Sequence, residues 1–182
     1  MPRKPFLLAL ALLSAPALAA DYAQAPGSTL AFAGKYQGEV FTGKFPGFAT
    51  RFSFDPKKLA SAKLDVTIPL ATASTGNADY DGELRGNGFF DSAKFPQARY
   101  TAGKFRALGG NRYAADGTLS LHGVNKPVTL EFTWTPGAKP VLAGKATVKR
   151  LDFGVGGGDW ADTTLIPDAI AISTKVVFAP AK

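Results

Sequence analysis

The chain has 182 residues with 21 Lys and Arg against 14 Asp and Glu, a formal charge of +7, one His, one Met and no Cys. The absence of Cys excludes iron–sulfur and thiolate-zinc sites and a thiol nucleophile, and a single His and a single Met leave almost no ligands for haem or zinc. The basic residues are scattered instead of forming a run, which argues against a nucleic-acid-binding protein.

Residues 1–19 have the pattern of a secretory signal peptide. The basic pair Arg3-Lys4 precedes a short apolar run, Phe6–Leu13, and Ala17-Leu18-Ala19 fits the small-residue cleavage motif. The apolar run is too short for a transmembrane anchor. We therefore expect an exported protein in which residues 20–182 form one domain.

Alternation of apolar and polar residues, which is typical of β-strands, dominates the rest of the chain. It is clearest in eight segments, 29–36, 48–55, 63–70, 100–108, 113–121, 128–134, 142–148 and 170–178. Two spans interrupt the pattern. The polar span 77–86 is expected to hold a short helix, and the Gly-rich span 152–168 is expected to be a loop with a short helical turn.

Eight strands with one apolar face each can form a sandwich or a closed antiparallel barrel. A closed barrel removes both exposed edges of the sheet, which favours that solution. The opposite face carries charges such as Arg51, Asp65 and Lys145. In the middle of a membrane each of these would cost about 2–4 kcal/mol, so we expect the apolar face to point inward and the barrel not to span a membrane.

The inward-facing side chains of this barrel differ sharply in size. The large ones include Phe52, Phe54, Phe132 and Trp134, and the small ones include Ala115, Gly117, Gly144 and Ala146. A barrel of this size either is filled by its own side chains or holds one small ligand. Small residues facing aromatic ones would leave an apolar slot for a hydrocarbon chain, which Gly117→Leu or Ala146→Phe would fill. The alternative is an ordinary core in which the rings fill the space over the small residues.

Two long motifs resemble those of the YceI family: FFDSAKFPQARY at 89–100 and LSLHGVNKPVTL at 119–130. A shorter one, RLDFGV at 150–155, is also similar. Members of this family are secreted, lipocalin-like bacterial proteins regarded as polyisoprenoid binders. The resemblance implies an all-β, eight-stranded antiparallel barrel with a short helix near its mouth, an isoprenoid tail inside it and a periplasmic location.

The segment GVGGGDWAD at 154–162 is similar to a subgroup associated with di-haem cytochromes b. The resemblance therefore implies a polyprenyl phosphate or a quinone as the ligand, no other cofactor, and a membrane cytochrome b as a candidate partner. An alternative function is an interaction module that docks on that cytochrome without a lipid. Lys35-Tyr36 and Glu83 stand where many members carry His, which indicates a different head-group chemistry.

No catalytic or metal-ligating residue is predicted, because His122 adjoins a Gly turn and no nucleophile-elbow motif is present. Arg85, Tyr36 and Trp160 are candidates for contacting a head group; a guanidinium at the mouth would bind a phosphate or quinone oxygen, unless Arg85 pairs with Asp81. The residues predicted to line the cavity are Phe32, Phe48, Phe52, Phe54, Leu64, Val66, Ile68, Tyr100, Ala115, Gly117, Leu119, Phe132, Trp134, Ala146 and Ile172.

Overall fold

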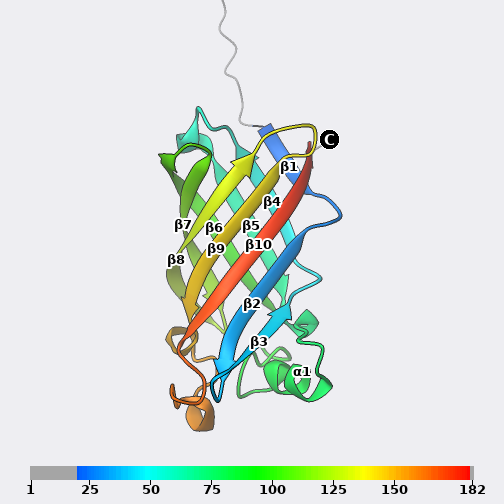
Figure 1. Ribbon diagram of the computed structural model, residues 1–182, viewed down its shortest axis with the longest axis vertical. Helices are drawn as coiled ribbons and strands as arrows, with labels where there is room; N and C mark the ends of the chain where they lie inside the picture. The colour runs from blue at the N-terminus through cyan, green and yellow to red at the C-terminus, as the bar shows by residue number, and fades with distance from the viewer. Residues whose placement is uncertain (1–19, 181–182) are drawn as a thin grey trace, which may run out of the picture.

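The computed structural model describes residues 20–180, which form a tall antiparallel β-barrel with its one α-helix at the lower end in Figure 1. The predicted signal peptide, residues 1–19, lies outside the described residues. The strands are β1 (Ala20–Gln24), β2 (Thr29–Tyr36), β3 (Glu39–Lys44), β4 (Ala49–Phe54), β5 (Lys63–Pro69), β6 (Gln97–Gly109), β7 (Arg112–Leu121), β8 (Val124–Thr135), β9 (Val141–Lys149) and β10 (Ala169–Pro180), and the helix is α1 (Ala78–Arg85).

Eight of these strands close the barrel. They follow the order β1-β4-β5-β6-β7-β8-β9-β10, and β1 pairs with β10 to complete the ring. Every pairing is antiparallel, so the predicted fold class is confirmed. The strands that form the ring differ from the prediction in one position, where β1 stands in place of β2. Neither β1 nor β3 was predicted as a strand. β1 has only five residues, and in β3 the apolar residues Val40 and Phe41 are adjacent, so neither strand gives a clear alternation signal.

The wall of the barrel contains more strands in its lower half than in its upper half. β1 and β2 pair with successive stretches of the same edge of β10, at Gln24↔Phe178 and at Thr29↔Lys175. β3 then pairs with β2 and is bridged through Lys44 to Ser74. Because the width of a barrel grows with the number of strands around it, the lower half is the wider one.

Aromatic rings fill the narrower half, and we call them the aromatic core. Phe52 stacks on Phe54 with ring centroids 4.8 Å apart, and Trp134 lies 5.3 Å from Phe54. The aromatic core consists of Tyr22, Phe52, Phe54, Phe105, Tyr113, Phe132, Trp134 and Phe178. The bulky inward residues of neighbouring strands therefore pack against one another and leave no slot opposite the small residues of β7.

The predicted slot over Gly117 is wrong, because the Tyr100 ring occupies that space. A Cβ at Gly117 would lie 2.6 Å from the Tyr100 ring and 2.5 Å from the Thr101 carbonyl oxygen. The Tyr100 hydroxyl lies 2.8 Å from the carbonyl oxygen of Ala115 and 3.1 Å from that of Val128, and these two acceptors share its one hydrogen. The glycine is needed for this close approach of ring and backbone.

Gly117→Ala is therefore expected to destabilise the barrel by about 1–3 kcal/mol through overpacking, without filling a ligand cavity. Denaturation in urea measures the change in the free energy of unfolding. Gly103→Ala is the matched control on the neighbouring strand, because a Cβ there would have no atom within 4 Å. Equal stability of the two variants would contradict the packing of Tyr100 over Gly117.

Candidate functional site

A cavity of about 180 Å³ lies below the aromatic core, between residues of the wider half of the barrel. Its wall is hydrocarbon apart from four side chains, Thr50, Tyr100, Arg150 and Thr174. At about 10–15 Å³ per water-sized group, a space of this volume holds roughly a dozen such groups. An apolar cavity of these dimensions favours a hydrocarbon occupant over water.

About half of the residues predicted to line a cavity lie on this wall. They are Phe32, Leu64, Val66, Ile68, Tyr100, Leu119, Ala146 and Ile172. Those that do not lie on it are Phe48, Phe52, Phe54, Ala115, Gly117, Phe132 and Trp134. Four of the latter belong to the aromatic core, Phe48 is buried in the turn before β4, and Ala115 and Gly117 lie beneath close-packed neighbours.

Two segments between strands complete the lower part of the cavity wall. Neither is a strand, so the alternation of apolar and polar residues gives no information about them. Leu84, Phe89 and Phe90 come from the end of α1 and the loop after it, and Val155 and Ile166 come from the long loop before β10. These segments cover the lower end of the barrel, which we call the mouth (Figure 1).

The predicted helix is confirmed as α1, and hydrogen bonds of two side chains hold it at the mouth. The Asn77 side chain caps it by accepting hydrogen bonds from the main-chain N–H groups of Asp79 and Tyr80. On the same helix the Asp81 carboxylate accepts from the Thr75 N–H and hydroxyl, the latter at 2.7 Å, and from the Ser74 hydroxyl at 3.1 Å. These bonds lower the pKa of Asp81 below its ordinary value of 3.8, the largest contribution being the Thr75 N–H.

Asp81→Asn is expected to loosen α1 and to lower the melting temperature by a few degrees. Because the folded-state pKa of Asp81 is lowered, its stabilisation is complete above its ordinary value of 3.8 and is lost as the pH falls through the lowered pKa. The stability difference between the wild-type protein and Asp81→Asn should therefore shrink in acid. Thermal unfolding between neutral pH and pH 3 measures it, with Asp79→Asn as the control for charge alone; a constant difference would contradict the assignment.

Arg150 organises the long loop and was missed as a site residue. Its side chain is 3% exposed, and all five N–H groups of its guanidinium donate to main-chain carbonyl oxygens. The acceptors are Pro167 at 3.3 Å, Val155 at 3.2 Å, Gly156 at 2.5 Å, Trp160 at 2.8 Å and Ile166 at 2.7 Å. Burial lowers the pKa of Arg150, and its donors are fully used within the loop.

None of the three head-group candidates lies on the cavity wall. Arg85 is paired with Asp81 at 3.9 Å, and its side chain is 47% exposed. This pairing is the alternative to head-group binding that the sequence left open for Arg85. The rings of Tyr36, Trp160 and Phe89 instead pack together at the mouth. The ring centroids of Tyr36 and Trp160 are 6.3 Å apart, and those of Trp160 and Phe89 are 5.5 Å apart. Contact of these residues with a head group stays a prediction.

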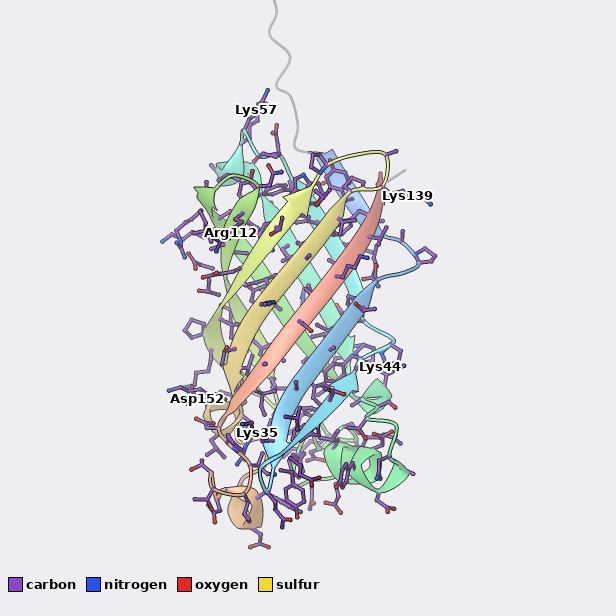
Figure 2. The ribbon with its side chains drawn as sticks, viewed as in Figure 1. Lys35, Lys44, Lys57, Arg112, Lys139 and Asp152 are labelled. Atoms are coloured by element: carbon purple, nitrogen blue, oxygen red, sulfur yellow. The ribbon has the colours of Figure 1, made fainter. Side chains whose placement is uncertain are left out.

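The mouth and the opposite end of the barrel differ in charge. Figure 2 shows Lys57, Arg112 and Lys139 toward the end away from α1. At the mouth, α1 carries three acidic residues against Arg85, and the segment 151–169 carries four Asp and no Lys or Arg. These two segments therefore present a net negative charge to an anionic group at the mouth, while Figure 2 shows Lys35 near the same end.

Within the part of the chain that the structure describes, no cluster of three or more His, Asp and Glu side chains is suited to a metal ion. His122 lies in the turn between β7 and β8, where its Nδ1 is 3.1 Å from the Phe153 carbonyl oxygen. It thereby joins this turn to the long loop at the mouth. The helices among residues 20–180 are all too short or too polar to cross a membrane.

The sequence matches the family described as the YceI-like domain over residues 23–178. A relative, a UPF0312 protein of Yersinia pestis, is 37% identical over 158 residues, which cover 81% of this chain and 82% of that protein.

Two solved structures share the fold. The crystal structure of BcnA from Burkholderia cenocepacia superposes with a TM-score of 0.79 at 30% identity, covering 82% of this chain and 95% of that chain. A structure described as a polyisoprenoid-binding domain from Saccharophagus degradans has a TM-score of 0.68 at 17% identity, covering 90% of this chain and 99% of that one.

Proposed function

We propose a function for this chain on the premise that it belongs to the YceI-like domain family. It is a periplasmic binding protein that holds an uncharged isoprenoid lipid in the cavity of its barrel, and it catalyses no reaction. The observation that carries the proposal is the cavity of about 180 Å³ with its hydrocarbon wall. The name of the Saccharophagus degradans domain supports the ligand class, and the signal pattern of residues 1–19 supports the location.

The size of the cavity sets how much of a lipid it holds. Roughly a dozen buried groups correspond to two or three isoprene units. At about 0.8 kcal/mol per buried CH₂, they contribute up to about 10 kcal/mol. This is comparable with the cost of about 4–15 kcal/mol for association. A longer tail therefore has to extend past Leu84 and Phe89, and it gains affinity from the apolar surface that they present.

Of the two ligand classes that the sequence indicates, the site favours a quinone over a polyprenyl phosphate. A phosphate in or near hydrocarbon needs a cation with unused donors. Arg150 uses all its donors on carbonyl oxygens, and Arg85 lies off the cavity wall beside Asp81. The acidic residues of α1 and of segment 151–169 add repulsion at the mouth.

Native mass spectrometry of the gently purified mature protein, followed by titration with ubiquinone and with a prenyl phosphate of matched tail, tests this function. The expected results are a co-purified neutral isoprenoid and at least tenfold tighter binding of the quinone. Neither a bound lipid nor binding of either compound would refute the carrier function, and tighter binding of the phosphate would refute the assigned ligand class.

A membrane cytochrome b is the partner proposed for lipid exchange, on the similarity of segment 154–162. A pull-down from solubilised membranes with the lipid-loaded protein should recover a haem-containing membrane protein. Recovery that is the same with a variant lacking segment 154–162 would count against this partner.

A further inference from the structure

We propose that Thr50 and Gln24 form a polar subsite at the inner end of the cavity, and that this subsite binds a hydroxyl group of the lipid. The inference rests on the proposed function and specifies the chemistry of its ligand. The oxygen-bearing end of the lipid then lies beside the aromatic core, and the apolar remainder points toward the mouth.

Thr50 is the polar side chain of the cavity wall whose hydrogen-bonding capacity is unused. It lies on β4 immediately before the aromatic core, it is 4% exposed, and its hydroxyl oxygen has no hydrogen-bond partner among the described residues. Tyr100 and Thr174 donate to the carbonyl oxygens of Ala115 and Thr29, and the Arg150 donors are likewise used. A buried hydroxyl without a partner in a hydrocarbon wall is unfavourable until something binds it.

Gln24 supplies a second unpartnered atom on the strand next to Thr50, at a residue that is not itself part of the cavity wall. Ala23 pairs with Arg51 across β1 and β4, so the next residue, Gln24, lies opposite Thr50. Tyr22, two residues earlier and therefore on the same face, packs in the aromatic core. The Gln24 amide nitrogen donates to the Phe48 carbonyl oxygen at 3.0 Å, which leaves Oε1 as a buried acceptor without a partner.

The two free atoms match one kind of ligand group. A hydroxyl accepts a hydrogen bond from the Thr50 hydroxyl and donates its own hydrogen to Gln24 Oε1. An ether or a quinone carbonyl accepts from Thr50 but has no hydrogen for Gln24. A phosphate or carboxylate would be an unpaired charge beside two neutral side chains in hydrocarbon. The subsite therefore selects an alcohol, or the hydroxyl of a reduced quinone.

Calorimetric titration with geraniol, geranyl methyl ether and the corresponding hydrocarbon without oxygen tests this subsite, because all three are of about the size that the cavity holds. The wild-type protein should bind the alcohol most tightly and the hydrocarbon least tightly, with each step roughly threefold to tenfold. Thr50→Val, which keeps the shape of the side chain, should remove the preference for oxygen, and Thr50→Ser should retain it. Gln24→Met should remove only the preference of the alcohol over the ether.

Equal affinity of the wild-type protein for the three compounds, or an unchanged preference in Thr50→Val, would overturn the subsite and leave the proposed function standing. Binding of none of them, and of no longer isoprenoid, would overturn both. Melting temperatures of the variants within a few degrees of the wild-type protein confirm that the changes in affinity are local.

Discussion

Ala146→Phe is expected to lower lipid affinity by at least about 100-fold while leaving the barrel folded. Ala146 is the smallest side chain on the inner face of β9 at the cavity, and its partner on β10, Ile172, also lies on the wall. A phenyl ring rooted there would occupy about half of the space for roughly a dozen groups. The expected cost in stability is about 1–3 kcal/mol at most, because the ring enters existing space.

Thr147→Phe is the matched control for this variant. Thr147 follows Ala146 on β9, and its side chain is exposed on the outer face of the barrel. The Thr147→Phe substitution adds the same ring to the same strand, but the ring does not enter the cavity. Fluorescence titration with a quinone should separate the two variants, and full affinity in a folded Ala146→Phe protein would mean that the lipid binds elsewhere.

Arg150→Met is expected to destabilise the protein by about 3–5 kcal/mol, the largest change in stability predicted for a single site. The substitution leaves five carbonyl oxygens of the long loop without their donor, two of them on Val155 and Ile166, whose side chains form part of the cavity wall. Arg150→Lys should recover little of this loss, because an ammonium group has three donors and no planar fork. Lipid affinity should also fall, since the mouth loses its shape.

Arg106→Met provides the control for loss of an arginine. Arg106 pairs with Asp116 at 2.8 Å on the outer surface, and its side chain is 51% exposed. Removing an exposed ion pair of this kind should cost less than about 1 kcal/mol. Similar unfolding midpoints in urea for the Arg150 and Arg106 variants would contradict the role given to Arg150.

The barrel could be predicted from the sequence because its signal is local. Alternation over six to ten residues identifies a strand and its inward face, and the eight long segments found in this way are all strands in the structure. β1 and β3 could not be found, since β1 has only five residues and β3 places the apolar residues Val40 and Phe41 next to each other instead of alternating them. β1 and β2 share one edge of β10, each pairing with a different stretch of it. This arrangement is a tertiary feature, and alternation contains no information about it.

The position of the cavity could not be predicted, because the sequence left a slot and a filled core as alternatives and did not place either along the barrel. Inward residues sort into large and small by sequence, but alternation does not say how far along the barrel each one lies. Phe52 and Trp134 fall in the narrow half and pack together, whereas Ala146 falls in the wide half and faces open space. Tyr100 covers Gly117 from a neighbouring strand, a contact that depends on the register.

The mouth was even less accessible to sequence reasoning. Leu84, Phe89 and Ile166 lie outside regular strands, and only the fold brings them to one end of the barrel. Arg150 was visible in a family-like motif, but a buried guanidinium bonded to carbonyl oxygens has no local signature. Thr50 points inward like Phe52 and Phe54 on the same strand, and only the structure reveals that its hydroxyl has no hydrogen-bond partner.

The proposed lipid binding depends most on the wide half of the barrel, and the most direct measurement is the electron density there in crystals grown without added lipid. We expect continuous density between Thr50 and Phe89, in contact with Ala146 and Ile172, from a neutral isoprenoid retained through purification. The lower half closed by its own side chains, or an empty cavity that stays empty after soaking with a saturating isoprenoid, would contradict the account.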